Sequence, residues 1–600
     1  MHNVTQCIII GIVSKKVGCI MRLQIVNSKN AASLYVVKSV YENGKRSSKV
    51  VEKLGTYADL LKTLEGEDPI NWAKKYIEDL NNKEKEEKRE VLVKYSPTKL
   101  INKGEQRTFN GGYLFLQKIY YEIGLHKICK KITQKYKFDF DLNSILSRLI
   151  YGRIIFPSSK RATYELSKRF IEQPSFDLHQ IYRALEVLAK ETDYLQSALY
   201  ENSLNVSKRN TGVLYYDCTN YFFEIEQEDG SKQYGPSKDH KPNPIVQMGL
   251  FMDGNGIPLA FSINKGNMNE QLTLKPLEKK IISDFELSKF IVCTDAGLAS
   301  QDNRKFNTKD GRAFITTQSI KKLKEHLKRW ALASDGWKLP GSEKTYDISK
   351  LDEMLEKATP ENKAKMRSKA FFKERWIKEN GFEQRLIVTY SLKYRDYQRK
   401  IRNSQIERAQ KVIATNPTKL KKCNPNDYKR FIYKTSCTSD GEVAENELYS
   451  IDAALIQKEE AFDGFYGVCT NLEDDVSEII KVNHRRWEIE ECFRIMKSEF
   501  KARPVYLSKN DRIEAHFTTC FISLIIYRLL EKKLNEEFTC HEIISELRDL
   551  NFKEIKGEGY EPLYTRTDFT DALHKAFDFR TDYQIVTSSK IKKILRDTKK

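Results

Sequence analysis

Two apolar runs that each end in an aspartate, far apart in the chain, most constrain what this sequence folds into. Val213-Leu-Tyr-Tyr-Asp217 and Phe290-Ile-Val-Cys-Thr-Asp295 have the length and the side chains of buried strands. A carboxylate at the end of such a strand is poorly placed for core packing, because its charge loses hydration there. The pattern therefore predicts a sheet whose strand ends carry acidic side chains suited to a metal ion.

A third acidic residue lies on a predicted helix that runs from Lys481 to Phe500. At about 100° per residue, Arg486, Glu490 and Lys497 fall within roughly 40° of one another, beside an apolar stripe. Taken alone, Arg486 and Glu490 are an exposed i,i+4 pair worth a few tenths of a kcal/mol. Together with the two aspartates, Glu490 completes the ligand set that two magnesium ions need to align water, phosphorus and a leaving oxygen.

The spacing of apolar residues after the first strand predicts the order of the sheet. Three adjacent strands before a helix are typical of the antiparallel half of a ribonuclease-H-like sheet. The strand that ends at Asp295 is expected to lie parallel to the first, which brings Asp217 and Asp295 side by side. The predicted strands are residues 213–217, 221–225, 245–252 and 257–263, and the helix covers residues 270–283.

The charge of the chain indicates a polyanionic partner. Lys and Arg number 103 against 83 Asp and Glu, a formal net charge of +20, and nucleic acid is the simplest such partner. A generally lysine-rich proteome is the alternative explanation. The 11 cysteines show no Cys-x2-Cys pair and no zinc spacing, so we expect reduced, mostly buried thiols in a cytoplasmic protein. The apolar run at residues 517–530 is interrupted by polar side chains, so we expect a core helix and no membrane partner.

Four segments around the first two acids resemble a known family. They are Tyr216-Asp-Cys-Thr219, Tyr234-Gly-Pro-Ser-Lys-Asp-His240, Gly266-Asn-Met-Asn-Glu270 and Asp295-Ala-Gly-Leu-Ala-Ser300. These segments are similar to the blocks found in bacterial insertion-sequence transposases of the DDE superfamily.

The third acid carries the same resemblance. A large subgroup of this family has a Tyr-x2-Arg-x3-Glu-x6-Lys signature, and Arg486, Glu490 and Lys497 match three of its four positions. Asn483 stands where the subgroup has tyrosine, so no phosphate or stacking role is carried over to it.

The resemblance implies an α/β fold: a ribonuclease-H-like catalytic core with a large β-rich insertion before the third acid, plus a helical N-terminal region. It implies that Asp217, Asp295 and Glu490 are catalytic and hold two Mg²⁺ ions, for which Mn²⁺ substitutes. Arg486 and Lys497 are expected to contact DNA phosphates. Lys238 and His240 lie in a loop near the first acid and have the same predicted role, with a solvated loop as the alternative.

Patterning along the chain predicts the domain boundaries. Residues 1–20 are an extension ahead of a possible start at Met21, and Asn43-Gly44 predicts a type I′ turn inside a hairpin. Basic helical residues between 111 and 208 fit either a DNA-end-binding region or a plain scaffold. The predicted units are residues 21–70 (β-hairpin module), 71–110 (charged helix or linker), 111–208 (helical region), 209–310 (first half of the core), 311–472 (insertion), 473–535 (second half of the core) and 536–600 (C-terminal tail).

The sequence predicts a transposase that cleaves DNA at the ends of an insertion sequence and joins it to a target. Synapsis of two ends implies a homodimer on double-stranded DNA, in the cytoplasm with the nucleoid. The alternatives are a ribonuclease-H-like nuclease without strand transfer and a catalytically silent DNA-binding descendant. Two local alternatives also stand: Trp487 packs on the sheet or stacks on a base, and the polar tail is a solvated terminus or grips DNA.

Overall fold

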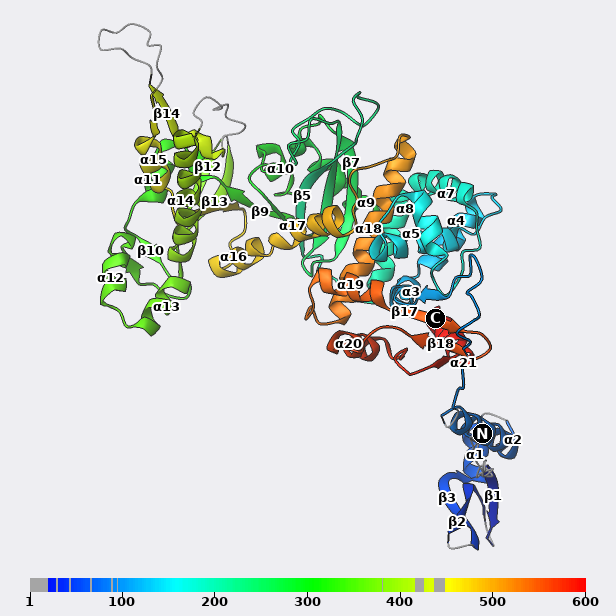
Figure 1. Cartoon of the computed structure of the whole chain (residues 1–600). Helices are drawn as coiled ribbons and strands as arrows, with labels where there is room; N and C mark the ends of the chain where they lie inside the picture. The colour runs from blue at the N-terminus through cyan, green and yellow to red at the C-terminus, as the bar shows by residue number, and fades with distance from the viewer. Residues whose placement is uncertain are drawn as a thin grey trace, which may run out of the picture. The chain divides into compact units, whose positions relative to one another are not determined.

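The computed structural model describes the chain apart from residues 1–19, 29–30, 43–44, 65–66, 88–89, 94, 380, 416–425 and 436–447. The chain divides into two compact units, residues 1–103 and 104–600, both drawn in Figure 1. The predicted N-terminal extension, apart from Ile20, and the predicted Asn43-Gly44 turn lie outside the described residues.

The smaller unit is an antiparallel sheet with two helices. Its strands pair in the order β1-β2-β3, and Met21, Val36 and Ile77 form its buried core. The predicted hairpin is confirmed as β2 and β3, while β1 was not predicted; the mixed-charge run falls largely on a helix. The elements are β1 (Met21–Asn27), β2 (Ala32–Glu42), β3 (Lys45–Thr56), α1 (Tyr57–Thr63) and α2 (Pro69–Glu87).

The larger unit begins with a helical region, as predicted. These helices pack on α18 (Asn510–Lys533), which lies between them and the sheet in Figure 1. Arg148, Arg153 and Lys160 are buried, so these three basic side chains serve the scaffold and are not available to DNA. The helices are α3 (Tyr113–Glu122), α4 (Leu125–Lys135), α5 (Leu142–Ile155), α6 (Lys160–Ser167), α7 (Leu178–Lys190) and α8 (Thr192–Ser203).

The central sheet of the described chain runs β11-β10-β12-β13-β16-β9-β8-β5-β6-β7. As predicted, β5, β6 and β7 are antiparallel and β8 lies parallel to β5. One detail of the prediction is wrong: residues 213–217 and 221–225 are not two strands, because β5 runs through Asp217 to Phe222. The bounds are β5 (Val213–Phe222), β6 (Ile245–Asp253), β7 (Pro258–Lys265), α9 (Leu274–Asp284), β8 (Ile291–Thr294), α10 (Gln301–Phe306) and β9 (Ala313–Gln318).

The insertion before the third acid extends the same sheet. Strand β16 pairs with β9 on one side and with β13 on the other. The insertion has its own core around the fully buried Trp337. The elements are α11 (Glu325–Leu332), β10 (Trp337–Lys338), β11 (Thr345–Tyr346), α12 (Leu351–Lys357), α13 (Pro360–Ser368), β12 (Ala370–Glu379), β13 (Phe382–Ser391), α14 (Leu392–Thr415), η4 (Tyr428–Phe431), β14 (Ile432–Thr435), β15 (Leu448–Ile451), α15 (Ala453–Glu460) and β16 (Phe465–Thr470).

The helix that carries the third acid is not one α-helix, which corrects the prediction. It consists of α16 (Val476–His484), α17 (Trp487–Arg494) and the π-helical η5 (Ile495–Glu499). At the break, the N–H of Arg486 donates to the carbonyl of Asn483 (3.3 Å), three residues back, which tightens the turn. The π-helical turn then shifts Lys497 relative to Glu490, so the uniform 100° spacing does not hold between them.

Helix α18 is the predicted core helix, and it is longer than the predicted run. Its length and composition would suffice to cross a membrane, although 94% of its most apolar window is buried inside the protein. Arg528 of this helix pairs with Glu531 (2.5 Å) and lies 3.8 Å from Glu488 of α17, so buried charges join the two helices.

The C-terminal segment is folded, and the expectation of a solvated polar tail is wrong. Its strands join β4 in a sheet of order β19-β18-β17-β4. Leu547, Phe552, Leu573 and Ile594 are buried in the core of the larger unit. The elements are β4 (Thr108–Asn110), α19 (Cys540–Asp549), β17 (Asn551–Ile555), β18 (Gly559–Pro562), α20 (Asp568–Phe577), β19 (Val586–Thr587) and α21 (Ser588–Asp597).

The close approach of Gly112 to α19 gives a test of this docking. A Cβ on Gly112 would lie 2.0 Å from the carbonyl oxygen of Leu547, which is backbone and cannot rotate away. We expect Gly112→Ala to lower the free energy of unfolding by about 1–3 kcal/mol in urea titrations. Gly212→Ala is the control, because its Cβ would make only an ordinary 3.5 Å contact with Asn210. Equal stability of the two variants would contradict the docked arrangement.

Candidate metal-dependent nuclease site

Asp217 and Asp295 lie at the same level of the sheet, as predicted. The parallel pairing of β5 with β8 ends at Tyr215 and Cys293, and each aspartate follows two residues later. Both side chains are half-buried. One carboxylate oxygen of each is held by the backbone: Asp217 Oδ1 accepts from the N–H of Cys218 (2.8 Å), and Asp295 Oδ1 accepts from Leu298 (3.0 Å). The Oδ2 atoms accept no hydrogen bond from any described residue.

The charge of Asp217 is costly in this position. Its pKa is raised to about 6, mainly by burial and to a lesser degree by the charge of Asp295, while Lys238 and Arg486 oppose the rise. Two neighbouring carboxylates repel each other when both are ionised, and a divalent cation bound between them would offset this repulsion. The donor set of this pair, hard carboxylate oxygens with one free atom each, fits Mg²⁺ or Mn²⁺.

Glu490 does not join the two aspartates in this structure. Its exposed carboxylate lies 3.2 Å from Arg486 Nη1, in an i,i+4 ion pair on α17. Among the residues that the structure describes, no group of three or more His, Cys, Asp or Glu side chains is placed to hold a metal ion. The prediction of a preformed three-acid pocket is therefore not met, and the role of Glu490 stays a prediction.

Arg486 is the side chain that links the three acids. Burial opposes its charge, yet its pKa is raised, because Tyr466, Glu490, Asp217 and Asp295 all stabilise the guanidinium. Its Nε atom is buried without a hydrogen-bond partner in the described chain. The sequence assigned Arg486 to phosphate, whereas the structure places its positive charge among the carboxylates.

Asn483, at the position where the signature has tyrosine, is buried and donates to the hydroxyl of Tyr466 (3.0 Å). Tyr466 lies on β16, the last strand of the insertion. A phenol therefore lies beside Arg486 although position 483 is not tyrosine. Sequence reasoning missed Tyr466, because it lies on a strand before the predicted helix and carries no motif that pairs it with Asn483.

Two of the predicted cations, Lys238 and Lys497, lie near enough to Asp217 to interact with its charge. Lys238 donates to the carbonyl of Cys218 and lies 3.3 Å from Glu270. Burial lowers the pKa of Lys497 to about 8, against the pull of Asp239, whose carboxylate is 4.0 Å away. His240 is exposed in the same loop, so its phosphate role stays a prediction.

Arg503 and Asp239 form an ion pair in this region that the sequence did not single out. Asp239 was visible as the residue between Lys238 and His240 in one of the segments that resemble the family. No sequence pattern pointed to Arg503, because it follows the end of the predicted helix and contacts the loop of Asp239 only in the folded protein.

Trp487 lies beside Glu490 with 58% of its surface exposed, so the expectation that it packs on the sheet is wrong. It lines a cavity of about 580 Å³ between α14, β16 and the α16–α17 turn. Tyr394, Tyr397 and Tyr466 line the same cavity, which is aromatic and open to solvent.

Residues 218–526, just over half of the chain, match the family model described as the transposase DDE domain. The chain belongs to this transposase family. The match contains Asp295 and Glu490 of the transposase and begins one residue after Asp217.

Other comparisons add little to this assignment. No curated protein sequence matches the transposase. Among solved structures, it is similar to the cryo-EM structure of a piggyBac transposase synaptic complex with hairpin DNA, at 8% identity and a TM-score of 0.33. That likeness covers 74% of the transposase and 82% of the other chain.

The raised pKa of Asp217 makes the stability of the transposase depend on pH. The folded-state value of about 6 lies above the ordinary 3.8, so the contribution of this group is fully present below pH 3.8 and is lost as pH rises through 6. We expect Asp217→Asn to gain roughly 1 kcal/mol more unfolding free energy at pH 8 than at pH 5, measured in urea with EDTA. The exposed Asp549→Asn is the control, and an equal gain at both pH values would contradict the assignment.

Proposed function

We propose that this transposase catalyses Mg²⁺-dependent cleavage and strand transfer of DNA at the ends of an insertion sequence. The observation that carries the proposal is the Asp217–Asp295 pair at one level of the sheet, inside a chain of the DDE transposase family. The strand order β7-β6-β5-β8-β9 supports a ribonuclease-H-like core. Membership of the bacterial subgroup with the Tyr-x2-Arg-x3-Glu-x6-Lys signature is part of the same proposal.

Asp217 and Asp295 would hold the metal, with Glu490 as the third ligand. Bound there, the metal supplies an activated water and a counter-charge for the departing 3′ oxygen. Glu490 reaches this position only when its ion pair with Arg486 opens. Glu490 is the more exposed partner of this pair, with 57% of its side chain exposed against 21% for Arg486.

The opening of this pair also frees Arg486. Its planar guanidinium can then donate two parallel hydrogen bonds to a DNA phosphate, in line with the role that the signature predicts. Lys238, His240 and Lys497 would hold neighbouring phosphates. In this proposal the metal would replace Arg486 as the positive charge beside the carboxylates, and Arg486 would bind the DNA phosphate instead.

The active-site region contains more than ion-binding groups. Trp487 and Tyr397 expose broad aromatic faces to the cavity beside Glu490, and such faces stack on unpaired bases. We therefore assign Trp487 to a base of the DNA end near the cut.

The same proposal includes a homodimer in the synaptic complex, since two DNA ends must be held together, and action in the cytoplasm at the nucleoid. A nuclease without strand transfer shares the metal chemistry. The two differ in the products, because only the transposase joins a pre-cut end to target DNA.

The carboxylate assignment is tested with duplex DNA that carries the inverted repeats flanking the coding region, a target plasmid and Mg²⁺. We expect joined products from the parent, and a loss of cleavage of at least a hundredfold for Asp217→Asn and Glu490→Gln with DNA binding retained. Glu478→Gln, which removes another exposed acid that pairs on a helix, is the control. Independently of activity, Mg²⁺ should raise the melting temperature of the parent and not of Asp217→Asn. Cleavage by Glu490→Gln would remove Glu490 from the ligand set.

The stacking role of Trp487 has its own test. We expect Trp487→Ala to weaken binding to end DNA by about 1–3 kcal/mol, and Trp487→Phe to keep most of the affinity, because a ring still stacks. Fluorescence anisotropy with labelled end DNA measures both. Because Trp487 is exposed, neither change should lower the melting temperature, and unchanged affinity of the alanine variant would exclude stacking.

A further inference from the structure

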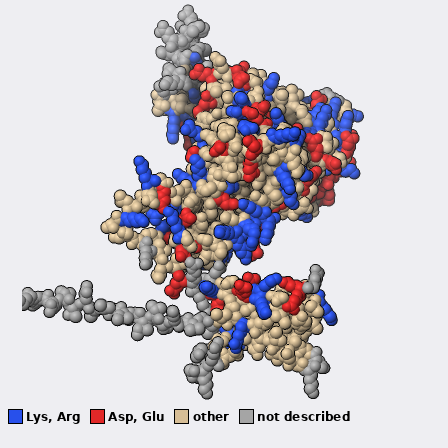
Figure 2. All heavy atoms as spheres, turned by 90° about the vertical axis from the view of Figure 1, so that its right-hand side faces the viewer, with Lys and Arg blue, Asp and Glu red and all other residues tan. Residues whose placement is uncertain are grey.

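The folded C-terminal segment encloses a large cavity that the proposed catalytic site does not use. The cavity has a volume of about 1010 Å³ and lies between α20, α21 and the loop that joins them, with Lys118 of α3 at one side. Seven cationic side chains of the described chain line it, against the carboxylates of Asp571, Asp578 and Asp597. At the height of α20 and α21, Lys and Arg side chains gather on the face shown in Figure 2.

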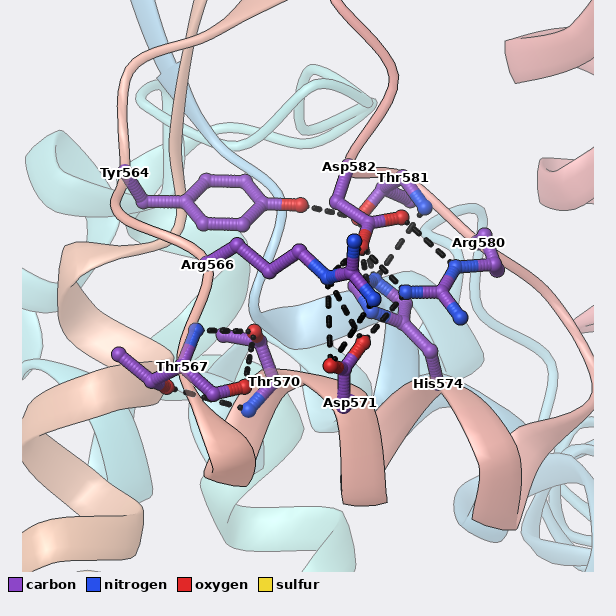
Figure 3. A network of polar contacts seen from close by, with 9 residues as sticks. All are labelled: Tyr564, Arg566, Thr567, Thr570, Asp571, His574, Arg580, Thr581 and Asp582. Atoms are coloured by element: carbon purple, nitrogen blue, oxygen red, sulfur yellow. Dashed lines mark hydrogen bonds and ion pairs between the residues drawn. The ribbon is translucent and has the colours of Figure 1, made fainter.

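Two arginines of the cavity are held rigidly by two carboxylates. Figure 3 shows Arg566 and Arg580 converging on Asp571, and Arg580 also on Asp582. Arg566 Nε lies 3.0 Å from Asp571 Oδ1, and Arg580 Nε donates to Asp582 Oδ1 (2.9 Å). Hydrogen bonding to Arg580 lowers the pKa of Asp582 to about 2, so the pair stays ionised.

This arrangement fixes the guanidinium planes and leaves part of each one unused. The Nη1 groups of Arg566 and Arg580 have no hydrogen-bond acceptor in the described chain, and the two side chains are 63% and 39% exposed. A guanidinium with immobilised Nε and Nη2 atoms loses little entropy when Nη1 binds an anion.

The loop that carries Arg580 is anchored by buried polar contacts. His574 of α20 is 2% exposed, and its Nε2 accepts from the backbone N–H of Thr581 (3.2 Å). The hydroxyl of Tyr564 lies 2.9 Å from Thr581 Oγ1. Burial lowers the pKa of His574, so the ring is a neutral acceptor that positions the loop.

Helix α21 supplies further positive charge. Lys590 and Lys593 lie three residues apart on the face toward the cavity, and Lys590 lies over the ring of Tyr583. Neither lysine has a carboxylate within ion-pair distance in the described chain. Lys592, on the same helix, is exposed but does not line the cavity. Two of the uncompensated charges of the helix therefore face the cavity.

We propose that this cavity binds the phosphodiester backbone of DNA, as a second contact surface separate from the Asp217–Asp295 site. Arginine forks and unpaired lysines are the groups that bind phosphate. The volume exceeds what a single phosphate needs and fits a segment of a strand. The choice of DNA as the polyanion rests on the proposed function; the phosphate chemistry does not.

The test uses the full chain and a Lys590→Gln/Lys593→Gln variant, with Lys592→Gln as the matched control. We expect the double variant to bind duplex DNA of any sequence more weakly, with the slope of log K against log salt less steep by about 1.8, or two phosphate contacts. The control should change the slope by no more than about 0.5. A Lys590→Arg/Lys593→Arg variant, which keeps the charge, should retain the parent slope.

The salt slope, the binding of inorganic phosphate and the melting temperature together decide whether the proposal stands. A parental slope in the double glutamine variant overturns the proposal, and so does weaker binding of inorganic phosphate with unchanged DNA binding, which would make the cavity a small-anion site. If the glutamine and the arginine variants both have a lower melting temperature than the parent, the weaker DNA binding results from impaired folding, and the proposal is overturned. Failure of the parent to cut DNA would refute the proposed function but leave the slope difference as a valid test.

Discussion

The parallel pairing of β5 with β8 is the constraint on which the rest of the site depends. The two strands separate after Tyr215 and Cys293, so Asp217 and Asp295 leave the ladder at one level with an oxygen each still free. Burial and mutual repulsion make this pair unfavourable without a compensating cation. Arg486, the N-cap residue of α17, supplies that positive charge. The unfavourable electrostatic free energy of the two neighbouring carboxylates therefore favours the binding of a cation.

The position of Arg486 in turn depends on how α17 is held. The hydroxyl of Tyr215 donates to the carbonyl of Val482 (2.8 Å), which fastens α16 to β5. Arg528 of the buried α18 lies near Glu488, and Arg153 donates to the carbonyl of Phe500 (2.9 Å) at the far end. Buried arginines thus fix the helix that carries Glu490, which explains why several basic residues are absent from the surface.

Sequence patterning recovered the antiparallel strands, the parallel strand and the core helix α18, because each has a strong apolar period. It failed at Arg485–Arg486 and at the π-helical turn, where a change of hydrogen-bond register leaves the apolar stripe nearly intact. It also failed for residues 540–600, whose short amphipathic elements look polar in a linear reading. Their apolar residues join a core that includes helices from the start of the larger unit, and Asn110 donates to the carbonyl of Leu547 (3.0 Å) across the same contact.

The sequence by itself determined which residues could do the chemistry: two strand-end aspartates, a helical glutamate and the cations around them, each fixed by local periodicity. Only the tertiary structure decided which of them meet. Asp217 and Asp295 meet because β5 pairs with β8 in the sheet. Glu490 instead forms an ion pair with Arg486, the oppositely charged side chain close to it on the helix. The tertiary structure also decided the contact of Asp239 with Arg503 and the C-terminal cavity, since contacts between distant segments leave no pattern along the chain.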